Sequence, residues 1–387
     1  PSHVDTFDLK EGPWLPARFN PTSYGDGVRF PQGLMPKVAA ELGNGTIGFV
    51  RSVRAWAGVH GLSQQWVQIG RNPTSPSARI SPHIGSVVSL ELSPPRGQDV
   101  ALPAFMAINA GQIPGEGYLP AQYAPFLLAG GAALPNTAHP RGPARLDQRY
   151  GLLQELDAET RSSFDIGEGA EEMANWNARA RMLMYNSAVD NVFRFDNNER
   201  TRYGNSAFGN GCLTARNLLR ARMGTRFVQI NFGSWDHHSN IYAPNAQLTP
   251  MATQFDNGLG NLIADLRGDG LLDDTLIVAM GEFGRTVGPV NANSGRDHFL
   301  QQSALFAGAG IRGGRAIGKT DDTGSRTVEP GWSRDRDVRN EDIEATLYSA
   351  LGIDWTTIRR DDPLGRGFEY VPNSREDLYG PVHELWS

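Results

Sequence analysis

The sequence predicts an α/β protein with a mostly parallel sheet and helices on both of its faces. In the second half of the chain, apolar runs of strand length alternate with longer segments of helical period, the order that builds a parallel sheet. The 45 glycines and 25 prolines among 387 residues indicate many loops around that scaffold. Polar clusters stand beside three of the predicted strands, where α/β proteins place their sites.

The first half supplies fewer regular elements, and its apolar runs are short. We expect a polar loop over 1–30, a helix over 37–42, a strand over 46–53, a loop, short helix and turn over 58–73, and buried or half-buried segments at 86–92 and 101–108.

A Gly-, Pro- and Ala-rich stretch without period, residues 109–143, reads as a long ordered loop or an insertion. Two amphipathic helices should follow, over 145–163 and 171–189. In the first of them one face carries apolar residues at helical spacing, namely Leu146, Tyr150, Leu153 and Leu156. We therefore predict a single domain over 1–387 in which residues 109–190 form an insertion, cap or arm.

The second half is more regular. We expect strands over 225–230, 275–280 and 303–308, and helices over 212–223, 250–267 and 341–352. The helix over 250–267 has a buried stripe at helical spacing: Phe255, Leu259, Leu262, Ile263 and Leu266.

Composition narrows the classes of partner. A net charge of −6 with no block of basic residues argues against nucleic acid and against anionic membrane surfaces. No apolar run reaches the length that spans a bilayer, and Cys212 alone permits no intrachain disulfide. Because PSHVDTFDLK reads as the interior of a motif, we expect a leading segment before Pro1, such as an export signal.

Polar side chains cluster beside three predicted strands: Asp236, His237 and His238 after 225–230, Glu282 and Arg285 after 275–280, and Asp297 and His298 before 303–308. In an open parallel sheet these strand ends share one edge, so the side chains should meet in one crevice. Carboxylate and imidazole ligands suit a transition metal or a Mg-like ion, according to their ratio.

A metal-free interpretation is also open. Asp236 can cap backbone N–H groups, and His298 can be a half-buried structural side chain. Glu282 can pair with Arg285 or Arg296, and a guanidinium in such a crevice suits phosphate, sulfate or carboxylate.

Two more segments hold candidate residues. His3 and Asp5 belong either to turns or to the same sheet edge, as the continuation of a first strand in the leading segment. His60 and Ser63 lie at the start of a helix, where an anion or a nucleophile is favoured, although Ser63 also suits a helix cap.

Long motifs spread over nearly the whole chain resemble a bacterial exported family, the domain of unknown function 1501, which is similar to sulfatases and alkaline phosphatases. The motifs are PSHVDTFD, IGRNP, RYGNSAFGNGCLTAR, FVQINFGSWDHHSN, GLLDDTLIVAMGEFGRT, GRDHF and DIEATLYSALGID. The resemblance implies an alkaline-phosphatase-like fold and export, usually through a twin-arginine signal.

The resemblance also implies a ligand pattern that this chain meets in part. Asp236 fits the first metal position, but Asn240 stands where a histidine is expected, and Glu282 with Phe283 replaces an Asp-His pair. His298 fits a last ligand, and His238 is a replacement for one that is lost. One metal or none therefore fits better than two.

We predict an exported, periplasmic hydrolase of a phosphate or sulfate ester, on a small substrate or a sulfated or phosphorylated glycan. Asp236, His238, Asp297 and His298 are the candidate ligands of one divalent ion, Zn, Ca, Mg or Mn, with a metal-free site as the alternative. His60 or Ser63 is the candidate nucleophile or general acid/base, with Glu282 and Arg285 beside it. The rival is a non-catalytic anion- or glycan-binding protein, and a phosphoglycerate-mutase-like transferase ranks last.

Overall fold

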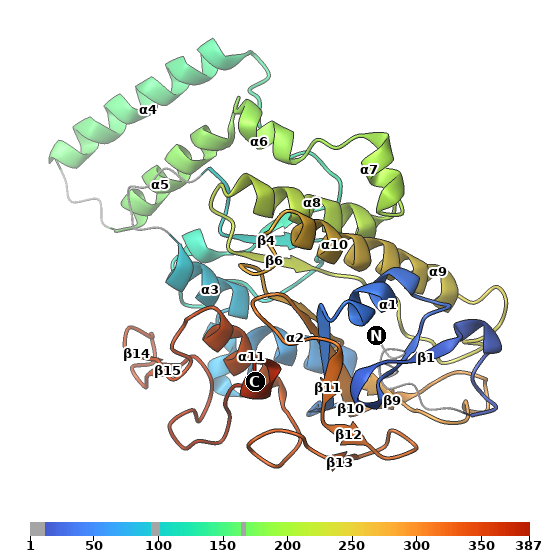
Figure 1. Ribbon diagram of the computed structural model, residues 1–387. Coiled ribbons are helices and arrows are strands. Elements are labelled where there is room, and N and C mark those ends of the chain that lie inside the picture. The colour runs from blue at the N-terminus through green and yellow to red at the C-terminus, as the bar shows by residue number, and fades with distance from the viewer. Residues whose placement is uncertain (1–11, 94–100, 164–167) are drawn as a thin grey trace.

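The computed structural model describes residues 12–93, 101–163 and 168–387 (Figure 1). His3 and Asp5 lie outside the described residues, so their predicted place at the sheet edge stays a prediction. The protein is a mixed α/β structure, which confirms the predicted class at that level, and no helix of the described part is long and apolar enough to cross a membrane.

One sheet is parallel throughout, with strand order β5 (Phe126–Leu128), β4 (Phe105–Ile108) and β6 (Phe227–Ile230). Phe105 lies opposite Phe227, and every residue of β4 is buried. Burial on both faces explains why this strand reads as a continuous apolar run instead of an alternating one.

A second sheet has the order β11 (Arg315–Ile317), β3 (Ile47–Arg54), β10 (Gln301–Ala307) and β7 (Ile277–Ala279). β10 runs antiparallel to both β3 and β7, so a mostly parallel arrangement is wrong for this sheet. The reason is the connection: the chain returns from the end of β7 through a short antiparallel pair, β8 (Gly284–Arg285) and β9 (His298–Phe299), with no crossover helix. Only a helical crossover would have brought it back in the parallel sense.

Helices cover both faces of the parallel sheet, as predicted. α8 (Ala207–Ala221) shares a buried cluster with Met106 and Ile108 of β4, whereas α3 (Ile84–Leu92) packs on the opposite face, near Phe227. Side chains at alternate positions of β4 and β6 pack toward one helix or the other, because strand side chains alternate between the two faces.

The predicted helix over 250–267 is realised as α9 (Leu248–Phe255), a π-helical segment η6 (Asp256–Gly260) and α10 (Asn261–Gly268). All five residues of its predicted stripe are buried, in one cluster with Phe208 and Cys212 of α8.

The remaining α-helices are α1 (Pro36–Gly43), α2 (His60–Ile69), α4 (Pro143–Ser163), α5 (Glu168–Leu183), α6 (Ser187–Val192), α7 (Asn197–Arg202) and α11 (Asn340–Ala350).

Helices α4 and α5 project from the body as an arm (Figure 1). The apolar face predicted for α4 is not buried: Leu153 and Leu156 are 38% and 53% exposed. The stretch 109–143 is largely loop, with β5 and the 3-10 helix η5 (Ala121–Tyr123) inside it.

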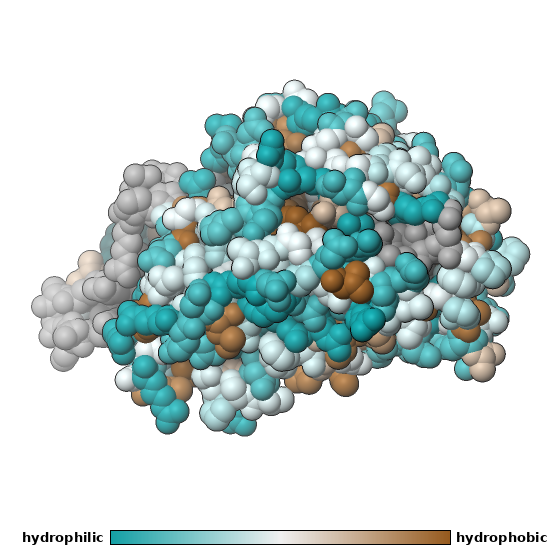
Figure 2. Space-filling view, turned by 60° about the horizontal axis from the view of Figure 1, so that its bottom comes forward, coloured by the Kyte–Doolittle hydropathy of each residue, from teal (hydrophilic) through white to brown (hydrophobic). Residues whose placement is uncertain are grey.

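Short elements complete the described part of the fold. They are the strand pairs β1 (Pro21–Ser23) with β2 (Arg29–Pro31), β12 (Lys319–Thr320) with β13 (Thr327–Glu329), and β14 (Ile358–Arg359) with β15 (Phe368–Glu369), and the 3-10 helices η2 (Ala17–Phe19), η3 (Gly25–Gly27), η4 (Pro76–Ile80) and η7 (His383–Leu385). The face of the molecule in Figure 2 is mostly hydrophilic, with small scattered hydrophobic patches.

Candidate functional site

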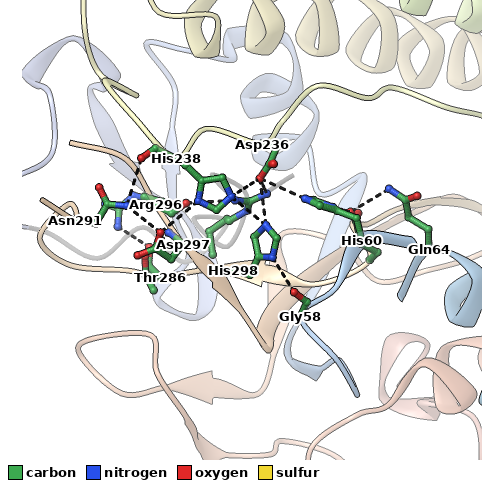
Figure 3. Close-up of polar contacts among 12 residues, drawn as sticks. Gly58, His60, Gln64, Asp236, His238, Thr286, Asn291, Arg296, Asp297 and His298 are labelled. Atoms are coloured by element: carbon green, nitrogen blue, oxygen red, sulfur yellow. Dashed lines mark hydrogen bonds and ion pairs between the residues drawn. The ribbon is translucent and has the colours of Figure 1, made fainter. Parts of the chain in front are cut away.

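Five segments deliver polar side chains to one edge of the two sheets, as the strand-end argument predicts (Figure 3). Asp236 and His238 follow β6, Glu282 follows β7, and Arg285 and His298 lie in β8 and β9. His60 opens α2. The convergence is direct: His60, Asp236 and His298 each offer one ligand atom, and these three atoms lie within 4.8 Å of one another.

The carboxylate of Asp236 is the centre of the site. Its Oδ1 lies 2.8 Å from Nε2 of His238, 3.2 Å from Nε2 of His298 and 3.3 Å from Nε2 of His60. A fourth group, the guanidinium of Arg285, donates to the same oxygen through Nη2.

Each of the three histidines directs its other ring nitrogen at an acceptor. Nδ1 of His60 lies 2.6 Å from a Glu282 carboxylate oxygen, and Nδ1 of His298 lies 2.7 Å from the carbonyl of Gly58. Nδ1 of His238 lies 3.3 Å from Oδ1 of Asp297. A neutral imidazole with its proton on Nδ1 offers a lone pair on Nε2. In that tautomer the lone pairs of all three histidines would point toward Asp236.

This arrangement leaves acceptors facing acceptors. Nε2 of His238 lies 3.1 Å from Nε2 of His298 and 3.3 Å from Nη1 of Arg285, and the buried Nε2 of His60 has no hydrogen-bond partner in the described part of the chain. Lone pairs held this close to one another and to a carboxylate repel unless a positive group lies between them. Only Arg285 supplies positive charge among these atoms, and a bound cation would relieve the remaining repulsion.

The ionisation of the acids supports that view. Burial raises the pKa of Asp236, but the guanidinium of Arg285 outweighs it and leaves that pKa well below its usual range. Burial likewise raises the pKa of Glu282, and the hydrogen bond from His60 reverses the shift, so the net pKa is lowered. Asp236, Glu282 and Asp297 are anionic against Arg285 and Arg296, which leaves a surplus negative charge when the histidines are neutral.

The spacing around Asp236 is comparable to that of metal ligands. Ligand atoms about 2.0–2.2 Å from a tetrahedral ion lie about 3.3 Å apart, and Asp236 Oδ1 lies 2.8–3.3 Å from the three Nε2 atoms. Among the described residues, however, the group whose ligand atoms all lie within 4.8 Å of one another consists of His60, Asp236 and His298, without His238. A second group holding the far nitrogen of each histidine is the usual support of metal ligands.

This geometry changes two predicted roles. His60, expected as a nucleophile or general acid/base, points its Nε2 at the same oxygen as the ligands. Asp297, expected as a ligand, instead accepts from Asn291 Nδ2 at 2.9 Å and faces Nδ1 of His238. Its carboxylate therefore orients His238 and does not face the centre of the site.

Three other predicted residues do not join the cluster. Ser63 is buried and donates to the carbonyl of Ala57 at 2.8 Å, so it is a structural residue and not a nucleophile. Arg296 is buried too, and its guanidinium donates to Tyr242 Oη and to the carbonyls of Thr286 and Gly288, so it cannot hold an anion. Asn240 has a left-handed backbone (φ 46°), and its exposed side chain makes no hydrogen bond or ion pair with the cluster among the described residues, so its role stays a prediction.

Sequence reasoning missed three groups that hold the histidines or the carboxylates beside them. They are the carbonyl of Gly58, the amide of Asn291 and Gln64, whose Nε2 donates to Glu282 at 3.3 Å. A backbone carbonyl gives no sequence signal, and neutral amides in polar loops are too common to stand out.

Comparisons with known proteins identify the family of this chain. The family described as "Protein of unknown function (DUF1501)" matches residues 1–375. No curated protein matches the chain. Nothing among the matches shows a relationship to sulfatases or alkaline phosphatases, or shows export, and these stay predictions.

Two solved structures resemble the chain weakly. A "Crystal structure of Ps i-CgsB" has 12% identity and a TM-score of 0.38, and the same protein "in complex with k-i-k-neocarrahexaose" has 13% identity and a TM-score of 0.41. Each match covers 89% of this chain and 71% of the other. Scores this low carry no argument about function.

Proposed function

The chain belongs to the DUF1501 family, and we propose that it is a metal-assisted hydrolase of a phosphate or sulfate ester. The observation that carries the proposal is the convergence of three imidazole Nε2 atoms on one carboxylate oxygen. Each of those imidazoles has its Nδ1 held by an acceptor.

The donor set selects the ion. Imidazole nitrogens with one carboxylate oxygen suit Zn²⁺, whereas Ca²⁺, Mg²⁺ and Mn²⁺ prefer oxygen-rich sites. A divalent ion bound here would act as a Lewis acid and lower the pKa of a water molecule to near neutrality.

The residues of the chain supply the remaining functions. Glu282 fixes the proton of His60 on Nδ1 and keeps Nε2 as a lone-pair donor. Arg285, only 4% exposed in its side chain, is held by Asp236 and by the carbonyl of Arg296 at 3.2 Å, so its charge stays at the centre of the site. Its guanidinium keeps the carboxylate of Asp236 ionised by lowering its pKa.

The rival function is anion binding without turnover, on a small ester or a sulfated or phosphorylated glycan. Its support is that only one metal site can be assembled from the described residues, whereas two-metal ester hydrolysis needs more ligands. Against it stands the charge: the local surplus is negative, and Arg285 is already neutralised by Asp236.

Purified protein, freed of metal with a chelator and titrated with Zn²⁺ and Mn²⁺, tests the proposal. We expect one ion per chain by elemental analysis and hydrolysis of p-nitrophenyl phosphate or p-nitrophenyl sulfate only in the loaded form. His238→Ala should lower metal affinity at least 100-fold and abolish turnover, whereas His383→Ala, an exposed histidine away from the cluster, should change neither.

Two results would contradict the proposal. Tight binding of phosphate or sulfate by metal-free protein, with no ester hydrolysed in any form, would favour the anion-binding rival. Hydrolysis that survives complete metal removal would exclude the metal from the mechanism.

A further inference from the structure

Helix α4 stands away from the body of the protein in the arm (Figure 1). Over 143–160, where its side chains are described, none is buried, and Leu146, Tyr150 and Asp157 are half-buried. These three mark the side of the helix that faces the rest of the chain. A helix in a protein gains most of its stability from tertiary packing, and α4 receives little of it from the described residues although it is 21 residues long.

The outer side of α4 carries a pair of exposed leucines. Leu152 and Leu156 are 57% and 53% exposed and lie one turn apart. At about 100° per residue, they lie roughly 120° around the helix from the half-buried side. Neighbouring exposed apolar side chains mark interaction surfaces more often than single ones do, so this side of α4 is a candidate surface for a partner.

Helix α5 presents apolar side chains in the same zone of the arm. It runs back along α4 (Figure 1), and its Arg181 pairs with Asp147 of α4. Trp176 lies five residues from Arg181, and Leu152 lies five residues from Asp147. At about 1.5 Å per residue, both are roughly 7–8 Å from the ion pair, at the same level of the arm. Trp176 is 40% exposed, and Met173, one turn further along, is 61% exposed. The exposed apolar zone therefore spans both helices.

The charges along the outer side of α4 make it complementary to itself. Its residues alternate in steps of four and three, the spacing of a seam between two helices, and they are Arg145, Arg149, Leu152, Leu156 and Glu159. This stripe is basic at one end, apolar in the middle and acidic at the other end. It pairs well with an identical stripe that runs in the opposite direction, because a parallel pair would set like charges side by side.

The leucines fix the register of such an antiparallel pair. Leu152 of each copy contacts Leu156 of the other. The charged residues stand three positions outside the leucines at either end, so Arg149 of each copy lies opposite Glu159 of the other. In the single chain Nη1 of Arg149 lies 3.3 Å from Nε2 of His139, and a charge-assisted bond to a carboxylate is stronger than this contact.

We propose that the outer side of α4 binds α4 of a second copy of the chain, antiparallel, in a dimer with twofold symmetry. Because symmetry doubles every contact, the interface holds two leucine pairs around its axis and an arginine–glutamate pair at each end. Trp176 and Met173, at the level of the leucines, extend the apolar area that the second copy can cover. Glu155 lies near its own copy at the rim, where water and salt screen the repulsion.

Sedimentation velocity of the 387-residue chain tests the proposal. We expect a mass of twice 42.2 kDa at high concentration and dissociation on dilution over about 1–100 µM, the range expected of a small interface. Arg149→Glu and Glu159→Arg each set like charges together at both ends of the interface, and each should weaken the dimer at least tenfold. Gln154→Glu, an exposed change of charge on the other side of α4, is the matched control and should leave the dimer unchanged.

Mixing the two charge variants tests the register itself. Each variant alone should be a monomer at concentrations where the native chain is a dimer. An equal mixture of Arg149→Glu and Glu159→Arg should recover the dimer, because every pair across the interface then joins opposite charges again. A misfolded variant could not recover in this way.

Three results would overturn the proposal. A native chain that is a monomer at every concentration would leave the outer side of α4 to a different protein. A dimer that both charge variants retain would place the interface elsewhere, and a mixture that stays monomeric would exclude the antiparallel register. None of these readouts depends on metal or turnover, so the proposed function can fail separately.

Discussion

Two buried arginines hold charge clusters of opposite character. The side chains of Arg216 and Arg285 are each 4% exposed. Arg216 donates to Asp265 at 3.0 Å, to Glu199 and to the amide oxygen of Asn217, so its cluster pairs donors with acceptors. Around Arg285, by contrast, three imidazole lone pairs and a carboxylate share one small space.

The difference teaches that buried charge alone does not identify a site. The Arg216 cluster is complete without any ligand, and its side chains tie α7, α8 and α10 together. For the Arg285 cluster we expect a bound cation to add stability, because its carboxylates and imidazoles outnumber its one guanidinium. A surplus of acceptors, and not the presence of charge, marks the functional candidate.

The largest expected effect is on stability, and it tests whether the Arg216 cluster holds the fold together. Arg216→Ala removes one of the three donors to the largely buried Asp265 and the partner of the partly exposed Glu199. We expect a loss of about 1.5–3 kcal/mol in the free energy of unfolding. Urea denaturation measures it. Arg220→Ala removes an exposed arginine from the same helix, paired with Asp269, and should cost at most about 1 kcal/mol. Equal losses in the two variants would erase the distinction.

A smaller effect is expected on metal affinity, and it tests the proposed role of the Arg285 cluster. Asp297→Ala removes the acceptor at Nδ1 of His238, and we expect metal affinity to fall about 10–100-fold while stability without metal stays nearly constant. Titration calorimetry with Zn²⁺ gives both the affinity and the stoichiometry. Asp297→Asn keeps an acceptor oxygen at this position and should recover most of the affinity. A complete loss of binding in both variants would make Asp297 a ligand after all.

The smallest expected effect is a loss of folding stability at acidic pH. Burial raises the pKa of Asp265, but its hydrogen bonds from Arg202, Tyr203 and Arg216 outweigh it and lower that pKa to about 2. Because the folded-state pKa is depressed, the stabilisation is present above the unfolded value near 4 and is lost as the pH falls toward 2. Thermal melts between pH 5 and pH 2 should show this loss, and Asp265→Asn should flatten it. A slope unchanged in that variant would assign the acid sensitivity to other carboxylates.

Much of the fold follows from the sequence because buried strands and amphipathic helices have clear periods. The predicted strands 225–230 and 275–280 contain β6 and β7, and the predicted helix 341–352 nearly coincides with α11. Strand direction was not accessible, because the antiparallel run of β10 depends on a short return through β8 and β9. The exposed leucines of α4 show that helical period alone does not fix burial.

The convergence of the candidate side chains was predictable, whereas their roles in a site stay predictions. Asp236, His238 and His298 stand at strand ends, and strand ends meet at one edge. Whether a carboxylate faces a metal or a histidine nitrogen depends on side-chain direction, which spacing does not contain. Ser63 illustrates this limit, since a helix-start serine reads the same whether it faces the crevice or donates to Ala57.

The pairing of β3 with β10 also sets the order in which the chain can fold. Gln301 donates to the carbonyls of Arg51 and Val53, which lie about 250 residues earlier in the chain. At about 5–20 residues per second on the ribosome, β3 is synthesised roughly 10–50 s before its partner strand β10. During that interval an apolar strand edge is exposed, so this sheet should form only after most of the chain has been synthesised, and chaperone demand should be highest before β10 emerges.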